Sequence, residues 1–323
     1  MRTAILGPLG PVSRLTLGGG IGQIWGETTH EEALATVHAA IDAGITLIDA
    51  APMYRNAEAF IGEAFAGRPP AGVRFTTKCQ LGSPEPRDVA GQLTASLEAS
   101  LAAMRLERID VFFLHSNLHA DGFDYAHGNA SRDRFSTAWS LYETEVVETF
   151  EALKAAGKIA AWGITGIGVP TPVIAAIQRT PRPDVVQAIA NLMDSPGALK
   201  RYAEPARPRE VAADARAAGC GVMGIRAVQA GALTAAIDRE LSPNSPDRAD
   251  YDRAAPFRAL CATWGEDPAY VAHRYALSMP NIDTVVLGVK SRAELAMCVA
   301  AEAAAPMEPE RIAAIDGLGL ATP

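Results

Sequence analysis

The sequence has little cysteine and few aromatic residues for its length. Only 4 of its 323 residues are cysteine, and they lie far apart with no Cys-x-x-Cys pair. This spacing excludes a disulfide framework and a cysteine-based zinc site, and it is typical of reduced thiols in a cytosolic protein. The aromatic fraction of 6% gives no indication of a substrate that stacks on aromatic rings.

Positive charge and long apolar runs are also scarce. The 29 lysines and arginines are outnumbered by 37 aspartates and glutamates, which gives a net charge of −8, and no basic cluster appears. A nucleic-acid partner is therefore not expected. No run reaches the roughly 18 apolar residues of a membrane span. Glycines and prolines interrupt residues 1–20, where a signal peptide needs an unbroken apolar stretch. We expect a cytoplasmic protein that acts on small molecules.

What the sequence does contain is a large hydrophobic fraction in a repeating pattern. Hydrophobic residues make up 49% of the chain, enough for a large core. Eight short apolar or β-branched runs are each followed by a segment with apolar residues at helical spacing. The predicted strands are residues 15–19, 45–49, 73–78, 109–115, 159–164, 184–189, 221–225 and 284–287.

This repeat predicts an α/β fold. The run Val111-Phe112-Phe113-Leu114 is continuously apolar, as in a strand that is buried on both faces and paired in parallel through helical crossovers. Eight such units without a break in composition predict a (β/α)8 TIM barrel, a single domain across residues 1–323. An open, doubly wound sheet is the alternative. Long loops at 117–144 and 229–256 interrupt the repeat after the fourth and seventh strands. We expect both loops at the carboxyl end of the barrel, where they would cover substrate and cofactor.

Ionisable residues end three consecutive predicted strands. Asp49, Lys78 and His115 each follow an apolar run, and Tyr54 lies in the loop after Asp49. Because these strand ends face one mouth of a parallel barrel, the four side chains can converge there. A buried lysine needs a partner, and Asp49 is the evident one.

The chemistry of these four residues is that of proton transfer to or from an oxygen atom. An ammonium beside a phenol stabilises the phenolate, so we expect Lys78 to lower the pKa of Tyr54. His115 could hold a carbonyl oxygen or relay a proton. This set supplies no hydride, so interconversion of a carbonyl and an alcohol requires a nicotinamide cofactor.

These residues and their surroundings resemble the aldo-keto reductase family. The tetrad Asp49, Tyr54, Lys78 and His115 matches the family's catalytic residues in order and approximate spacing. Residues 44–64, 97–110 and 150–165 resemble further signatures of the family. The resemblance implies a (β/α)8 barrel that binds NAD(P)H at its carboxyl face. It also implies that Tyr54 donates the proton, that Lys78 and Asp49 adjust the pKa of Tyr54, and that His115 orients the carbonyl.

The resemblance also implies cofactor-binding positions, with several departures from the usual pattern. Thr165 and Gln187 correspond to residues that grip the carboxamide, and Ile225 replaces a stacking tyrosine. Lys290 takes the place of the basic residue at the 2′-phosphate, which favours NADP(H), with NAD(H) possible, although Glu294 replaces a usual glutamine. By the same resemblance, Arg226 and residues 231–233 correspond to the segment at the pyrophosphate, and residues 288–298 to the segment at the adenosine. The full predicted set is Gly19, Thr165, Gln187, Ile225, Arg226, Ala227, Gly231, Leu233, Gly288, Lys290, Glu294 and Cys298.

Trp25 and Met53 are predicted to wall the substrate pocket. Reduction of aldehydes or ketones is the expected reaction, and a sugar 1-dehydrogenase of the same family is the alternative. Two more distant alternatives are a Schiff-base aldolase built on Lys78 and a barrel that senses NADPH. A metal site formed by His115 and His119 is not expected, since one residue ends a strand and the other lies in a loop. The sequence does not indicate the oligomeric state.

Overall fold

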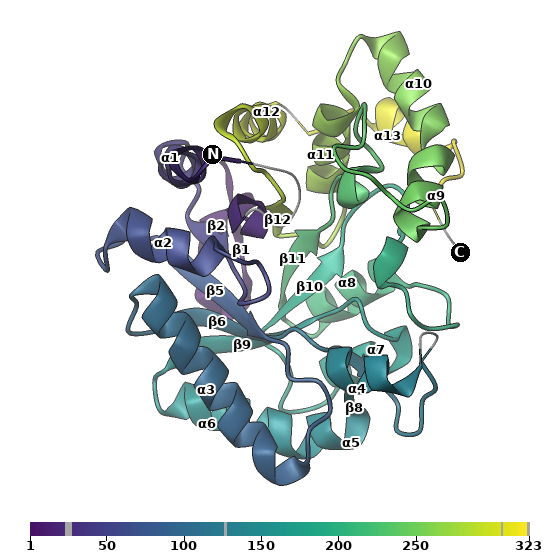
Figure 1. The fold of residues 1–323 in the computed structure, drawn as a ribbon. Helices are drawn as coiled ribbons and strands as arrows, with labels where there is room; N and C mark the ends of the chain where they lie inside the picture. Colours follow the sequence, from purple (N-terminus) through teal and green to yellow (C-terminus); the bar gives the residue numbers. More distant parts are fainter. Residues whose placement is uncertain (23–27, 126–127, 305, 322–323) are drawn as a thin grey trace.

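The computed structural model describes residues 1–22, 28–125, 128–304 and 306–321, and its centre is a closed barrel of eight parallel strands. Neighbouring strands follow one another in chain order around the barrel (Figure 1). The barrel strands are β3 (Leu15–Leu17), β4 (Leu47–Asp49), β5 (Arg74–Cys79), β6 (Ile109–Leu114), β9 (Ile159–Thr165), β10 (Val185–Ile189), β11 (Gly221–Ile225) and β12 (Thr284–Leu287). The predicted barrel is confirmed, and the open sheet is wrong because the last barrel strand, β12, pairs with the first, β3, and closes the sheet on itself.

Each of the eight predicted strands coincides with a barrel strand, with bounds that differ by at most two residues. The first strand ends at Leu17 instead of residue 19. A Cβ atom on Gly18 would lie 2.2 Å from the backbone oxygen of Leu287, so the glycines bring the chain close to the end of β12. They then form a short 3₁₀ turn, η2 (Gly19–Gly22).

Helices surround the barrel and follow the strands in alternation (Figure 1). The side chain of Thr29 accepts a hydrogen bond from the backbone nitrogen of Glu32 and so caps α1. The helices outside the barrel are α1 (His30–Asp42), α2 (Ala57–Phe65), α3 (Pro86–Met104), α6 (Val147–Ala155), α7 (Pro170–Gln178), α8 (Pro208–Ala217), α10 (Ala255–Trp264), α11 (Pro268–Ser278), α12 (Arg292–Ala303) and α13 (Pro309–Asp316). Among the described residues, no helix has the length and hydropathy needed to cross a membrane.

Both long loops contain structure of their own. The loop after β6 holds β7 (Asn117–His119), α4 (Asn129–Phe135), β8 (Ser136–Ala138), α5 (Trp139–Leu141) and a π-helical turn, η3 (Tyr142–Val146). The loop after β11 holds a 3₁₀ turn, η5 (Gln229–Gly231), and α9 (Pro246–Arg253). Because each loop follows the carboxyl end of its strand, both lie on the face where the site is expected.

An N-terminal hairpin that the sequence did not reveal closes the amino end of the barrel. It consists of β1 (Thr3–Ile5) and β2 (Pro11–Ser13), paired antiparallel around the turn η1 (Gly7–Leu9). Gly7 packs against the backbone of Asp184 and Gly221, at the starts of β10 and β11. Leu6 and Val12 of the hairpin belong to a separate apolar cluster with residues of the barrel interior: Leu47, Val111, Phe113, Ala161, Val185 and Met223.

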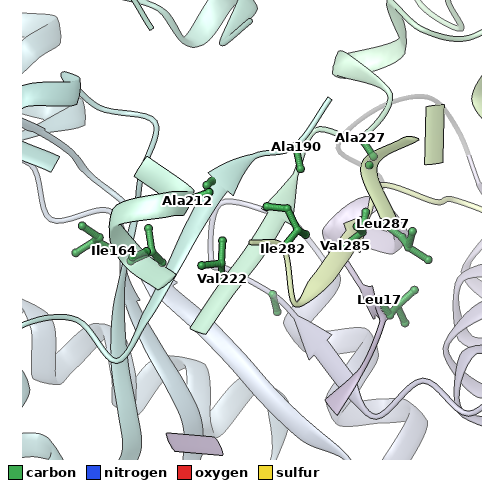
Figure 2. Packing of buried hydrophobic residues seen from close by; sticks show 14 of the residues in the cluster. Leu17, Ile164, Ala190, Ala212, Val222, Ala227, Ile282, Val285 and Leu287 are labelled. Atoms are coloured by element: carbon green, nitrogen blue, oxygen red, sulfur yellow. The ribbon is translucent and has the colours of Figure 1, made fainter. Parts of the chain in front are cut away.

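Strand alternation separates this interior from the larger core outside the barrel. Residues two apart on a strand point to the same side, so Val222 and its neighbours of the same parity point outward toward the helices. Figure 2 labels members of this outer core on β3, β11 and β12, among them Leu17, Val222 and Leu287. Interior positions two residues beyond the apolar cluster along each strand therefore lie at the carboxyl end of the barrel.

Candidate active site

A buried ion pair occupies the barrel interior at its carboxyl end. Asp49 follows the interior residue Leu47 by two positions on β4, and Lys78 lies near the end of the neighbouring strand β5. The Nζ atom of Lys78 lies 2.6 Å from Oδ2 of Asp49 and donates a second bond of 2.8 Å to the backbone oxygen of Ala50. The two side chains are 0% and 2% exposed. The structure thus brings Asp49 and Lys78 together as the sequence predicts.

Neighbouring side chains hold the other oxygen of Asp49. Its Oδ1 accepts hydrogen bonds from the hydroxyl of Thr76 and, at 2.9 Å, from Nε2 of Gln187 on β10. Burial by itself lowers the pKa of Lys78, but Asp49 and Tyr54 outweigh it, so the pKa lies above its usual value. The amine is therefore protonated at neutral pH, which stabilises negative charge nearby.

Tyr54 reaches this ion pair from the loop after β4. The Nζ atom of Lys78 lies 4.5 Å from the centroid of the Tyr54 ring. The glycine-rich turn η2 also packs against the tyrosine. A Cβ atom on Gly19 would lie 2.1 Å from Cδ2 of Tyr54, and one on Gly22 would lie 2.0 Å from its backbone oxygen. Gly19 therefore serves to position Tyr54 in this structure, because no larger residue fits there.

The pKa of Tyr54 differs from the expectation that Lys78 would lower it. Burial raises the pKa above its usual value, Lys78 opposes this shift, and Asp49 adds to it. The expected lowering is thus wrong for the net pKa, because the sequence could not weigh desolvation and the Asp49 charge against the ammonium. The phenol is consequently protonated at neutral pH, the form that can donate a proton.

His115 completes the group beside the Tyr54 ring. The two ring centroids are 5.6 Å apart at an interplanar angle of 87°. Burial and the charge of Lys78 lower the pKa of His115 to about 3, so its imidazole is neutral. Its Nδ1 atom is buried and has no hydrogen-bond partner among the described residues. A neutral imidazole can hold an oxygen through a hydrogen bond but does not carry a positive charge to it.

The predicted carboxamide-binding residues are direct neighbours on the barrel wall. Thr165 ends β9 and lies opposite Gln187 of β10 in the parallel register. The hydroxyl of Thr165 donates to the backbone oxygens of Leu114, at 3.3 Å, and His115, at 3.2 Å. Its one proton is already used, so this hydroxyl is oriented to accept a bond from an amide and not to donate one. Ile225 ends β11 two positions past the apolar interior residue Met223 and is half-buried.

Arg226, which the resemblance places near the pyrophosphate, belongs to a polar network at the base of the loop after β11. The Nε atom of Arg226 donates to Gln229 at 3.0 Å, and its NH2 lies 3.2 Å from Asp247 of α9. Gln229 in turn bonds Asp250 and Asn191 at 2.8 and 3.0 Å. The sequence missed this network, which ties Arg226 to two carboxylates distant in sequence.

Two further predicted cofactor positions, Ala227 and Leu233, are buried. Gly231 is half-buried, and its φ of 91° favours glycine.

At the predicted adenosine end, carboxylates hold the cations. Lys290 forms a hydrogen-bonded ion pair with Asp238 and lies 3.6 Å from a carboxylate oxygen of Glu294. Glu294 also accepts a bond of 2.8 Å from the backbone nitrogen of Lys290. Arg292 pairs with Glu32 of α1 at 2.9 Å. A 2′-phosphate would therefore have to displace or compete with these carboxylates.

The two remaining predicted adenosine positions differ in accessibility. Gly288 is exposed, and a Cβ atom there would meet nothing within 4 Å. Cys298 is fully buried, and its Sγ atom lies 3.5 Å from Nε2 of His273 on α11. Cys298 thus packs between α11 and α12 instead of facing open space.

Comparison with known proteins gives the family. The model of the aldo/keto reductase family matches residues 14–319. The chain belongs to this family. An aldo-keto reductase from Bacillus halodurans, solved in its holo form, has the same fold, with a TM-score of 0.72, 21% identity, and coverage of 98% of this chain and 96% of that one.

Two relatives in this family carry sugar-related names. L-galactose dehydrogenase from Arabidopsis thaliana is 23% identical over 285 residues, which cover 87% of this chain and 81% of that protein. A 6-dehydroglucose reductase from Novosphingobium aromaticivorans is 35% identical over 98 residues, which cover 27% of this chain and 32% of that protein. This aldo/keto reductase is therefore an oxidoreductase, and its family uses nicotinamide cofactors.

The rim of the mouth contains residues that the sequence did not single out. Gln80, two residues past Lys78, donates to Ser116 Oγ at 3.0 Å, and Ser116 also accepts from the backbone of Gly82 at 2.8 Å. These contacts join the segments just after Lys78 and His115. Gln80 and Ser116 each lie within two positions of a catalytic candidate, and that adjacency was the available signal.

Of the two residues predicted to wall the substrate pocket, the structure describes only Met53. Met53 is 48% exposed beside Tyr54, as expected of a residue at the rim. Trp25 lies outside the described residues. Among the described residues, no group of three or more His, Cys, Asp or Glu side chains could hold a metal ion. The Nδ1 atom of His119 instead bonds the backbone oxygen of Ala120 at 2.8 Å.

Proposed function

We propose that this aldo/keto reductase interconverts aldehydes or ketones and alcohols, with Tyr54 as the proton donor and acceptor. The observation that carries the proposal is the buried Lys78–Asp49 pair directly beside the Tyr54 ring. A protonated lysine at this place stabilises the phenolate that remains when Tyr54 gives its proton away.

The donor set fits a nicotinamide dinucleotide. The Thr165 hydroxyl and the Gln187 amide lie next to the catalytic ion pair and suit a carboxamide, while Arg226 and Lys290 follow β11 and β12 and suit phosphate groups. When bound, this cofactor supplies or accepts the hydride.

Each residue of the tetrad then has a separate task. His115 is neutral, so it holds the substrate oxygen by a hydrogen bond and directs it toward the Tyr54 hydroxyl. Tyr54 donates its proton to that oxygen in reduction and takes a proton from the alcohol in oxidation. Asp49 keeps Lys78 charged and in place, and Thr76 and Gln187 keep Asp49 in place.

For the cofactor, we propose that the chain binds both NADP(H) and NAD(H). Lys290 supports NADP(H), as the sequence suggests, but its pairing with Asp238 and Glu294 weakens its attraction for a 2′-phosphate. A 2′-hydroxyl could instead donate a hydrogen bond to Glu294, as carboxylates do for the ribose of NAD in other folds.

A sugar 1-dehydrogenase is the second candidate function. The match to L-galactose dehydrogenase over 87% of this chain supports it, since that relative is named for oxidation of a sugar. The same tetrad serves both directions, so the two candidates differ in substrate and not in mechanism. The Schiff-base alternative has less support, because the ion pair with Asp49 keeps Lys78 protonated and an amine nucleophile must be neutral.

A substrate panel tests the proposal. Aldehydes, ketones, sugars and alcohols are mixed with each of the four nicotinamide dinucleotides, and the absorbance of the reduced nicotinamide is followed. We expect consumption of the reduced cofactor with at least one carbonyl compound. If the protein binds NADPH but turns over no member of the panel, the sensor alternative is favoured, and if it binds neither cofactor, the proposal is wrong.

A further inference from the structure

We propose that Arg201 and Tyr125 form an anion-binding subsite at the mouth, so that the preferred carbonyl substrate carries a carboxylate or phosphate group. This inference rests on the proposed function, since it names the class of substrate for the same site. It depends on where the two side chains lie, on their lack of partners, and on the surrounding charge.

The subsite lies between two loops at the carboxyl end of the barrel. Arg201 belongs to the loop after β10, and its guanidinium carbon lies 4.9 Å from the Phe135 ring and 5.9 Å from the Tyr125 ring, both in the loop after β6. The backbone oxygen of Phe135 accepts a bond of 3.1 Å from Gln80, two residues past Lys78. This hydrogen bond ties Phe135 to the segment that follows β5, the strand that carries Lys78, and Arg201 packs on the Phe135 ring.

Neither polar group of this subsite has a partner in the part of the chain that the structure describes. Among the described residues, no carboxylate forms an ion pair with Arg201 and none of its nitrogens makes a hydrogen bond. The Tyr125 side chain is only 7% exposed, yet its buried hydroxyl also has no partner in the described part of the chain. A buried hydroxyl without a hydrogen bond is costly, and the phenol ring that carries it contacts a guanidinium that also has no partner. Both groups therefore lack the acceptor that an anion would supply.

The surrounding charges leave Arg201 available to an anion. The chain has a net charge of −8, but nearby carboxylates are already used: Asp133 pairs with Arg132 at 2.8 Å, and Glu204 pairs with Arg207 at 2.6 Å. A second arginine, Arg134, lies over the Phe135 ring at 5.0 Å. Among the described residues, neither Arg201 nor Arg134 forms an ion pair with a carboxylate.

Stacking on aromatic rings prepares the guanidinium for such a ligand. Cation–π contacts hold the flat face of an arginine within about 6 Å of the ring centroid. The N–H groups lie in the plane of the guanidinium and remain free at its edge. They match the two oxygens of a carboxylate or phosphate, and the Tyr125 hydroxyl would donate to the same group.

Matched substrate pairs test the proposal. The first pair is 4-formylbenzoate and its uncharged methyl ester, and the second is glyceraldehyde and glyceraldehyde 3-phosphate, which distinguishes a carboxylate from a phosphate. We expect Arg201→Gln to raise the KM of the charged member of the preferred pair by about ten- to a hundredfold, the value of a charged hydrogen bond. The KM of the neutral member should change less than about twofold, and Tyr125→Phe should have a smaller effect of the same selectivity.

Arg207→Gln is the matched control, because Arg207 lies in the same loop but is paired with Glu204 and Glu210. It should leave all four KM values unchanged. Equal losses for charged and neutral substrates in Arg201→Gln would show that Arg201 only joins the two loops, and no change in either would also overturn the proposal.

A binding measurement separates this inference from the proposed function. If the wild-type protein reduces none of the four compounds, the proposed reaction fails for them. Calorimetric titration of the NADP⁺-loaded protein with 4-formylbenzoate and with glyceraldehyde 3-phosphate still decides the subsite. Binding of either that Arg201→Gln abolishes supports it, and absence of binding of both, or binding independent of Arg201, contradicts it.

Discussion

The two ends of the barrel interior are built from the same strands but from opposite kinds of residue. At the amino end, Leu6 of the hairpin meets Leu47 and Phe113 in a sealed apolar cluster. Two residues after Leu47 on β4 the interior residue is Asp49, and two residues after Phe113 it is His115, just past the end of β6. The comparison teaches that strand alternation gives both ends their direction, while the residue type decides whether a layer stabilises the fold or performs chemistry.

The largest effect is expected when a single charge is removed from the polar end. Lys78→Met leaves the buried Asp49 carboxylate without its ion pair, so the free energy of unfolding should fall by about 3–5 kcal/mol and turnover should be lost. Chemical denaturation and an assay of reduced cofactor measure the two effects. The double variant Lys78→Met/Asp49→Leu should regain much of the stability but no activity. Equal instability of the single and double variants would contradict the account of Asp49 as an unpaired charge.

A substitution at the apolar end should reduce stability alone. Phe113→Ala removes a large interior side chain that packs against Gly163, where a Cβ atom would lie only 2.4 Å from the Phe113 ring. The free energy of unfolding should fall by about 3–5 kcal/mol because a cavity remains. In the folded fraction, the affinity for NADPH and the pH profile should match the wild type. A shifted pH profile would show that the two layers are not separate.

The pH dependence of the reaction distinguishes the polar groups. Because the pKa of His115 is lowered to about 3 and that of Tyr54 is raised above its usual value, neither group titrates between pH 5 and pH 8 in the protein without ligand. The rate of carbonyl reduction should therefore be flat over this range. Alcohol oxidation needs the phenolate, so its rate should rise toward alkaline pH. A reduction rate that titrates near pH 6.5 would assign a charged role to His115.

The same lowered pKa has a consequence for stability. An unfolded chain has a histidine pKa near 6.5 and binds a proton that the folded His115 does not bind. The contribution of His115 is thus fully present above about pH 6.5 and is lost as the pH falls toward 3. Denaturation curves at pH 7 and pH 5 should show lower stability at pH 5. His115→Gln, which has no titrating ring, should reduce the difference.

The smallest effect is expected at the exposed edge that would hold the adenosine. Glu294→Gln removes one of the two carboxylates at Lys290, so the affinity for NADPH should rise about two- to fivefold, since half-exposed ion pairs contribute little. The affinity for NADH should stay the same or fall. Fluorescence titration measures both constants. An unchanged ratio of the two affinities would show that Glu294 does not influence cofactor choice.

The sequence predicted the barrel well because its strands are continuous apolar runs that only a buried parallel sheet explains. It missed β1 and β2, because strands of three residues carry too little pattern to separate from a loop. The tetrad was found because each member stands next to such a run.

The parts of the site that the sequence did not reveal depend on long-range contacts. Asp238 pairs with Lys290 across 52 residues, and no local spacing indicates that contact. The contact of Arg201 with Tyr125 likewise joins two loops whose relative position only the folded barrel fixes. The predicted direction of the Tyr54 pKa shift was wrong for the same reason, since burial of the phenol in the folded chain is the largest cause of the shift.

Single-turnover kinetics of Tyr54→Phe test the central claim most directly. The variant and the control Tyr270→Phe, on α11 outside the site, are loaded with NADPH and mixed with methyl 4-formylbenzoate or the best substrate of the panel. Loss of a general acid predicts that Tyr54→Phe oxidises the cofactor about 10²- to 10⁴-fold more slowly than the wild type, while its affinity for NADPH changes less than about twofold. Oxidation by Tyr54→Phe at a rate close to that of Tyr270→Phe would contradict the assignment of Tyr54 as the proton donor.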